Sequence, residues 1–262
     1  MESKLIQYKN KNIFYSITGK GRPVVLLHGF GEDGNIWNTL AENLHQEFKC
    51  VIPDLPGSGK SDWLTGDNIS LEDYADGIKC ILDREDIAET TMIGHSMGGY
   101  ITLAFAEKYP QLLKGFGLFH SSAFADDDDK KETRVKTITF IKEKGVPQYL
   151  KTSFPNLFAD KGHPAIEKLI EAGKTISSET LIQYLQAMIK RPDRTNFLQS
   201  YKKPVLFIIG EKDAAVPLQT SLQQCHLPPI AFVNILKNVG HMGMVEAEIE
   251  SGNAVLNFLQ NI

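Results

Sequence analysis

The sequence has no excess of basic residues and few cysteines. Lys and Arg number 28 against 32 Asp and Glu, which gives a formal net charge of −4. Such a chain has no electrostatic footprint for nucleic acid or for an anionic membrane surface. The three cysteines, Cys50, Cys80 and Cys225, are an odd number without C-x-x-C spacing, which argues against a disulfide framework or a zinc knuckle. We therefore expect reduced thiols and a small-molecule partner.

Long hydrophobic runs are also missing. No stretch approaches the ~20 consecutive apolar residues that a membrane-spanning helix needs. The first residues, 1–7, become polar too early for the apolar region of a secretory signal. The sequence therefore predicts a cytoplasmic protein that does not contact a membrane.

The composition that remains is that of a folded globular protein. Of the 262 residues, 42% are apolar and 23% are charged, close to the usual proportions of such domains. This length fits one large α/β domain that carries an insertion as well as it fits two small domains.

Short apolar runs alternate with helical patterns along most of the chain. A hairpin is predicted from residues 5–8 and 13–17. The runs typical of strands buried on both faces are 24–27, 50–52, 91–93, 117–119, 205–209 and 232–236. Helical patterns cover 36–45, 70–84, 96–109, 217–224 and 244–259. This alternation predicts a mostly parallel sheet with helices on both faces.

The alternation stops between residues 121 and 203. This stretch is charged and has helical patterns at 131–144, 165–172 and 178–189. We predict a core domain of residues 1–120 and 204–262 and a helical cap, 121–203, over the carboxyl ends of the strands. Asp126 to Asp129 are expected to be a solvated helix start. An apolar minority of the cap is expected to face the site: Phe140, Tyr149, Leu150, Phe154, Phe158 and Tyr184.

The strongest local signal is Gly94-His95-Ser96-Met97-Gly98, a match to G-x-S-x-G. An apolar run leads into it and an alanine-rich helical segment follows. A serine on such a strand-to-helix turn has strained backbone geometry and an exposed hydroxyl. Ser96 is therefore the predicted nucleophile.

A serine needs a base and a group that orients the base. Asp213 follows the strand at 205–209, and His241 lies between the last strand and the last helix. Both loops are predicted at the carboxyl edge of the sheet. His120 is the rival base, and Glu211 is the rival acid.

Two backbone amides are needed for the oxyanion of acyl transfer. The Met97 amide follows the predicted nucleophile, and the Phe30 amide lies in the loop after the strand at 24–27. We predict these two as the oxyanion hole.

Two glycine motifs resemble phosphate-binding loops. Residues 29–34 read G-x-G-x-x-G, with Asp54 at the spacing of a dinucleotide fingerprint. Its Glu32 and Asp33 would repel a pyrophosphate. Residues 54–61 lack only the first glycine of a Walker A loop, but no helical pattern follows. We predict neither nucleotide binding nor a metal site.

Together these residues carry a resemblance to the α/β-hydrolase fold superfamily. The resemblance rests on residues 28–31, 54–61, 94–99, 210–213 and 240–241. It implies an eight-stranded, mostly parallel sheet with a helical cap, and a catalytic triad of Ser96, Asp213 and His241.

The resemblance implies no cofactor and a serine hydrolase acting on a small carboxylic ester, lactone or thioester. Two alternatives stay open. One is a carbon-carbon bond hydrolase or a cofactor-free haloperoxidase. The other is a ligand receptor or signalling regulator with an intact triad and a protein partner.

Overall fold

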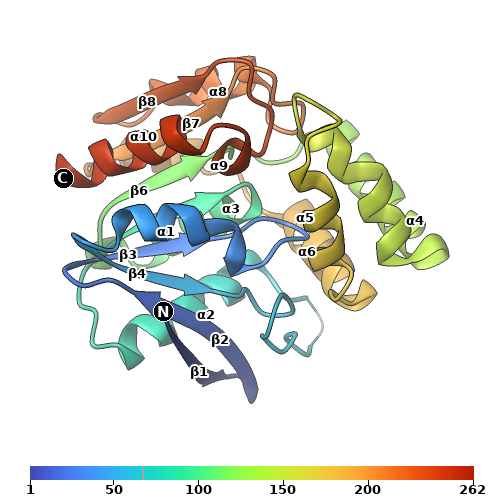
Figure 1. Cartoon of the computed structure of the whole chain (residues 1–262), viewed down its shortest axis with the longest axis horizontal. Helices are drawn as coiled ribbons and strands as arrows, with labels where there is room; N and C mark the ends of the chain where they lie inside the picture. Colours follow the sequence, from blue (N-terminus) through green and yellow to red (C-terminus); the bar gives the residue numbers. More distant parts are fainter. Residues whose placement is uncertain (67) are drawn as a thin grey trace.

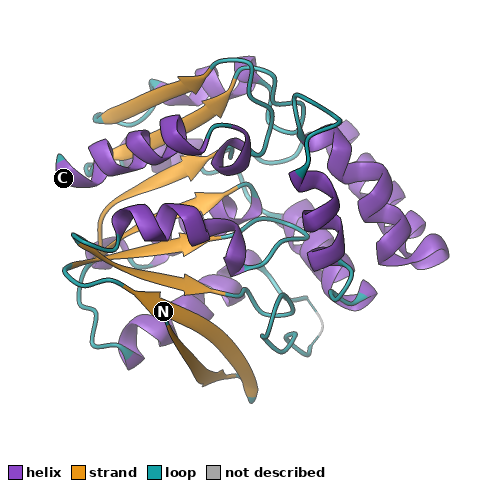
Figure 2. Cartoon of the chain, in the orientation of Figure 1, coloured by secondary structure: helices purple, strands orange, loops and turns teal. Residues whose placement is uncertain are grey.

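The computed structural model describes residues 1–66 and 68–262. Eight strands form one sheet in the order β1-β2-β4-β3-β5-β6-β7-β8 (Figures 1 and 2). β1 and β2 form the predicted antiparallel hairpin, β2 pairs antiparallel with β4, and the other neighbours are parallel. The strands are β1 Glu2–Tyr8, β2 Lys11–Thr18, β3 Arg22–Leu27, β4 Phe48–Pro53, β5 Thr90–His95, β6 Leu113–Phe119, β7 Val205–Gly210 and β8 Ala231–Leu236. The predicted fold class is confirmed.

Helices cover both faces of this sheet (Figure 2). β3 is apolar and buried from Val24 to Leu27 because alternate side chains enter two different cores. Val25 and Leu27 belong to one core, whereas Val24 and Leu26 belong to the other. The helices on the first side are α2 Leu71–Arg84, α3 Met97–Lys108 and α8 Leu218–Cys225. Those on the second side are α1 Asn38–Leu44 and α10 Glu248–Gln260.

The segment between β6 and β7 is helical, as predicted, and lies beyond the carboxyl ends of the strands (Figure 1). Its helices are α4 Asp128–Ser153, α5 Ala165–Gly173, α6 Ser178–Lys190 and α7 Thr195–Ser200, with a 3-10 turn η3 at Phe154–Leu157. α4 is longer than the expected helix because it continues past a kink at Gly145, which has φ of +79°.

The four aspartates around the start of α4 do not behave alike. Asp127 caps the helix by accepting a hydrogen bond from the Lys130 amide, and Asp128 and Asp129 are exposed. Asp126 is buried and pairs with Arg134 and Arg191. The expectation of a solvated position was wrong for Asp126, because two guanidinium groups replace the water that its carboxylate would otherwise need.

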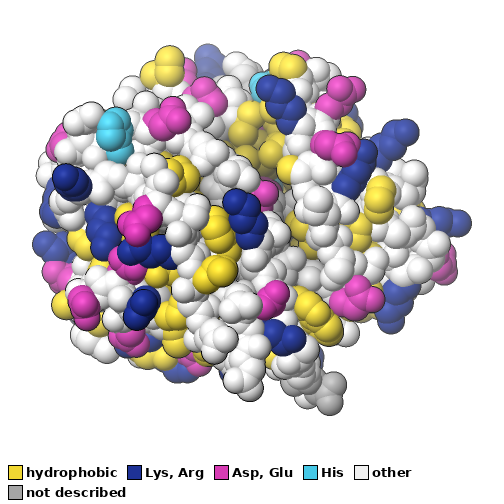
Figure 3. Space-filling model, turned by 60° about the horizontal axis from the view of Figure 1, so that its bottom comes forward, with side chains coloured by type: hydrophobic (Ala, Val, Ile, Leu, Met, Phe, Trp, Pro, Cys, Tyr) yellow, Lys and Arg dark blue, Asp and Glu magenta, His cyan; other side chains and the backbone are white. Residues whose placement is uncertain are grey.

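The last helix is also divided. A short helix α9, Gly243–Glu246, precedes α10, and Ala247 between them has a non-helical backbone. No helix among the described residues has both the length and the apolar character needed to cross a membrane. On the described part of the face in Figure 3, basic and acidic side chains are interspersed.

Candidate active site

Ser96 lies at the turn between β5 and α3. Its backbone has φ of +50° and ψ of −114°, outside the conformations that a serine ordinarily adopts. The turn brings α3 close to the end of β3, since a Cβ on Gly98 would lie only 2.5 Å from the Leu27 carbonyl oxygen. The predicted strand, turn and helix around Ser96 are therefore present, and so is the strain.

The loop after β3 lies against Ser96 because β3 and β5 are neighbours. A Cβ on Gly29 would be 3.2 Å from the Ser96 Cβ and 2.8 Å from His95 Nδ1, so only glycine permits this approach. Within residues 1–66 and 68–262, neither the Phe30 amide nor the Met97 amide donates a hydrogen bond to another protein group. Both amides are thus free to serve a ligand.

Asp213 and His241 meet at the carboxyl edge of β7 and β8. His241 Nδ1 lies 2.8 Å from Asp213 Oδ2, and both side chains are buried. The other oxygen, Oδ1, accepts hydrogen bonds of 2.8 Å from the amides of Ala215 and Val216. Burial alone would raise the pKa of Asp213, but the facing His241 and the polar contact with His120 outweigh it and hold that pKa well below its ordinary value.

The ionised Asp213 fixes the tautomer of His241. An ionised carboxylate can only accept a hydrogen bond, so Nδ1 carries the proton and Nε2 is left as the acceptor. The rival acid Glu211 is exposed and accepts a hydrogen bond from the Asn238 amide instead.

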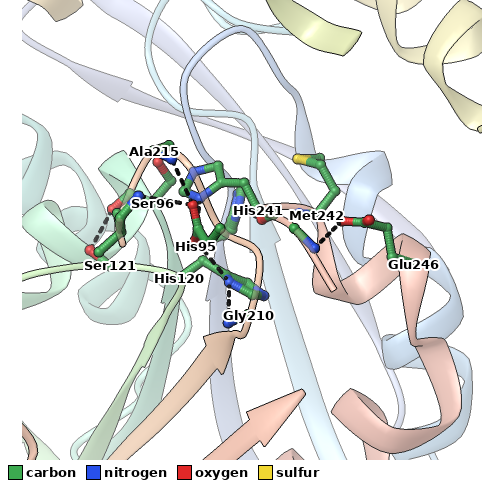
Figure 4. A network of polar contacts seen from close by, with 12 residues as sticks. His95, Ser96, His120, Ser121, Gly210, Ala215, His241, Met242 and Glu246 are labelled. Carbon is green, nitrogen blue, oxygen red and sulfur yellow. Dashed lines mark hydrogen bonds and ion pairs between the residues drawn. The ribbon is translucent and has the colours of Figure 1, made fainter. Parts of the chain in front are cut away.

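His120, the rival base, is buried behind Asp213. Its Nδ1 lies 3.1 Å from Asp213 Oδ2 and also 3.1 Å from the Gly210 amide nitrogen, while its Nε2 has no hydrogen-bond partner among the described residues (Figure 4). Burial lowers the pKa of His120 to about 4, so the ring is neutral at pH 7. The polar contact of His120 is therefore with Asp213, the predicted acid, rather than with Ser96.

Among the described residues, His120, Asp213 and His241 also form a group whose possible ligand atoms lie within 4.8 Å of one another, close enough for a metal ion. Ligands placed about 2.1 Å from a tetrahedral ion lie about 3.4 Å from one another. Asp213 Oδ2 is only 2.8 and 3.1 Å from the two ring nitrogens. Those are hydrogen-bond distances, so the geometry fits an acid-base cluster better than a metal site.

Ser96 and His241 line one cavity of about 320 Å³ beneath the helical insertion. Phe30 also lines it, together with Tyr149 and Phe154 of the insertion. Leu150, Phe158 and Tyr184 are buried elsewhere, and Phe140 is half-buried outside this cavity. Of the six apolar residues expected at the site, the structure brings two to it.

The glycine motifs that resemble phosphate loops have other contacts. Asp54 accepts hydrogen bonds from the amides of Gly34 and Lys60, and Asp33 accepts one from the Asn35 amide, so the first two amides of the 3-10 turn η1, Gly34–Trp37, are already used. The loop 54–61 lies under α6, where the Tyr184 hydroxyl donates to the Pro56 carbonyl oxygen at 2.8 Å. These contacts explain both motifs without a phosphate.

A family model described as the alpha/beta hydrolase fold matches residues 22–135, which include Ser96 but not Asp213 or His241. A thermophilic esterase from Thermogutta terrifontis superposes with a TM-score of 0.93 at 27% identity, over 100% of this chain and 99% of that one. The protein has the α/β-hydrolase fold.

Two relatives extend the comparison. The chain is 26% identical to Lipase 3 of Moraxella sp. (strain TA144), over 95% of this chain and 79% of that protein. It is 28% identical to 2-hydroxy-6-oxononadienedioate/2-hydroxy-6-oxononatrienedioate hydrolase of Burkholderia vietnamiensis, over 95% and 91%.

A buried ion pair that the sequence did not reveal lies beneath the site. His95 Nδ1 is 3.1 Å from Glu32 Oε2, and His95 Nε2 is 2.9 Å from the His241 carbonyl oxygen. Since both partners are acceptors, both ring nitrogens must carry protons. Burial would lower the pKa of His95, but the Glu32 carboxylate raises it; burial would raise the pKa of Glu32, but His95 and the Gly29 amide lower it.

Glu246 of α9 holds the loop that carries His241 (Figure 4). Its Oε1 accepts hydrogen bonds of 3.1 Å from the amides of Gly240 and Met242, on either side of His241. Its Oε2 accepts one of 2.7 Å from the Ala159 amide of the insertion. The sequence signal for this role is weak, because Glu246 stands among several acids near the final helix.

Proposed function

We propose that this hydrolase cleaves small carboxylic esters, or related lactones and thioesters, through an acyl-enzyme on Ser96. The observation that carries the proposal is that Ser96, on its strained turn, shares a cavity with a His241 whose Nδ1 is held 2.8 Å from Asp213. The esterase and lipase relatives support the same reaction class.

In the proposed reaction, His241 Nε2 takes the Ser96 proton as Oγ attacks the ester carbonyl carbon. The Phe30 and Met97 amides donate to the resulting oxyanion. The ester C–O bond then breaks, and His241 returns the proton to the leaving alkoxide. Water, deprotonated by the same nitrogen, cleaves the acyl-enzyme to give the acid and free Ser96.

We propose residues 121–203 as a cap that sets substrate choice. The segment contributes Tyr149 and Phe154 to the cavity wall, whereas the proposed triad comes from loops of the β-sheet domain, 1–120 and 204–262. The T-shaped contact between Phe30 and Tyr149, with ring centroids 6.0 Å apart, joins the two parts at the site.

The test replaces Ser96 with Ala. Ser96→Ala should abolish hydrolysis of short p-nitrophenyl esters and labelling by a fluorophosphonate while the protein stays folded. Ser153→Ala is the matched control, because Ser153 is another serine that lines the same cavity. Undiminished labelling of Ser96→Ala would refute the mechanism.

Labelling and turnover assays of the wild-type protein separate the esterase from the receptor and from the carbon-carbon bond hydrolase. A ligand receptor would take the fluorophosphonate but turn over no ester or lactone. Cleavage of 2-hydroxy-6-oxononadienedioate in preference to every ester would favour the activity in the Burkholderia vietnamiensis relative's name.

A further inference from the structure

The cavity wall formed by α4 is cationic where a small-molecule pocket is usually apolar. Lys130, Thr133, Arg134 and Thr137 line the cavity, and their spacing of three and four residues places them on one face of the helix. Two cationic side chains and two threonines, whose hydroxyls donate to carbonyl oxygens of α4, therefore line the space next to Ser96.

These cations are only partly neutralised. Asp126, whose side chain is fully buried, is shared by two guanidinium groups: Arg134 Nε lies 2.6 Å from its Oδ2, and Arg191 Nη1 lies 2.9 Å from the same atom. The Lys130 ammonium donates to the Ala215 carbonyl oxygen at 3.1 Å rather than to a carboxylate.

Nearby acids are used elsewhere. Asp127 caps α4, and Asp128 pairs with Lys131. Glu32, the acid that lines the cavity, is paired with His95. Asp213 is paired with His241.

The pKa of Tyr100 is consistent with a positive electrostatic potential in the cavity. This tyrosine of α3 lines the cavity, and Arg191 stacks over its ring at 4.0 Å. Burial would raise the pKa of Tyr100, but the positive charges of Arg191, Arg134 and Lys130 outweigh burial and lower it. The cavity thus favours a negative charge.

We propose that the substrate is an ester that carries a second, ionised carboxylate, bound by Lys130 and Arg134 beside Ser96. The inference rests on the proposed function and narrows it to a substrate class. A carboxylate loses hydration when it enters the cavity, and charged donors restore that loss. A neutral ester of the same length would leave the Lys130 ammonium with no anionic partner, and Arg134 with only the Asp126 carboxylate that it shares with Arg191.

The first test compares anionic with neutral esters. The pairs are monomethyl adipate with methyl hexanoate, for a carboxylate on the acyl part, and 4-acetoxybutanoate with butyl acetate, for one on the alcohol part. We expect kcat/KM to be at least about tenfold higher for the anionic member of one pair, as one charged hydrogen bond allows. Equal or lower values for both anionic esters would overturn the proposal.

Variants assign the preference to α4. Lys130→Gln and Arg134→Gln should each reduce the ratio of anionic to neutral kcat/KM about tenfold, mainly through KM. Lys136→Gln is the matched control, because Lys136 is an exposed lysine of the same helix paired with Glu132. An unchanged ratio in both cavity variants would refute the role of these residues.

A binding measurement does not depend on turnover. Calorimetric titration of Ser96→Ala with monomethyl adipate and 4-acetoxybutanoate should show binding that weakens about tenfold when Lys130→Gln is added. Absence of ester cleavage by the wild-type protein would refute the proposed function. Cleavage of neutral esters, with no kinetic preference for the anionic esters and no calorimetric binding of them, would refute only this inference.

Discussion

The buried pair of Glu32 and His95 connects three parts of the candidate site. Glu32 Oε2 accepts from the Gly29 amide at 2.7 Å, and His95 holds the His241 carbonyl oxygen. The two side chains are only 2% and 1% exposed, so water does not compensate either charge if its partner is lost. Glu32→Gln keeps the size of the side chain and an acceptor for the Gly29 amide, so this change removes mainly the negative charge.

We expect Glu32→Gln to lower the free energy of unfolding by about 3 kcal/mol, because breaking a buried ion pair strands the other charge. For a chain of this size that corresponds to a fall in Tm of about 6–12 °C.

The loss should depend on pH. The raised pKa of His95 makes its contribution complete below its unfolded value of about 6.5, and that contribution is lost as pH rises through the folded pKa. The lowered pKa of Glu32 makes its contribution complete above its unfolded value of about 4.3, and that contribution is lost as pH falls through the folded pKa. The difference between wild type and Glu32→Gln should therefore be largest between about pH 4.3 and 6.5.

The measurement is urea unfolding of both proteins at pH 5.5 and at pH 8.5. Glu42→Gln serves as the control, because Glu42 is exposed and its removal should change stability by less than about 0.5 kcal/mol. A loss below about 1 kcal/mol at pH 5.5, with the same value at pH 8.5, would show that the pair is not ionised in the folded protein.

Three further predictions concern the site. Asp213→Asn should reduce kcat by about 10⁴, because the His241 tautomer is no longer fixed; if Asp126→Asn had that effect instead, with stability unchanged, the acid would belong to the insertion. Tyr149→Ala and Phe154→Ala should change the order of kcat/KM among esters of increasing acyl length. Truncation of Phe158, outside the cavity, should lower stability and leave that order unchanged. A uniform loss of kcat/KM for all esters in the Tyr149 and Phe154 variants would contradict a role in substrate selection. Activity should survive dialysis against EDTA, and a loss restored by a divalent ion would reveal a metal requirement.

The sequence alone determined the features that local patterns control. The runs around 91–93 and 205–209 are apolar enough to be strands buried on both faces, and their loops must then lie at one edge of a parallel sheet. This reasoning placed Ser96, Asp213 and His241 at the same edge, although the last two are separated from Ser96 by more than a hundred residues. It works because strand direction and the right-handed crossover leave few alternatives.

The tertiary structure decided which polar and aromatic side chains meet. Asp126 looked solvated among its acidic neighbours, but Arg134, eight residues further on, and Arg191, far along the chain, enclose it. Glu32 and His95 are charged and buried because β3 and β5 are adjacent. Such pairings depend on how distant segments pack. A local hydrophobic period shows that a segment is helical, but it does not show which face of that helix lies against the site. The space beside Ser96 therefore takes its charge from contacts that exist only in the folded chain.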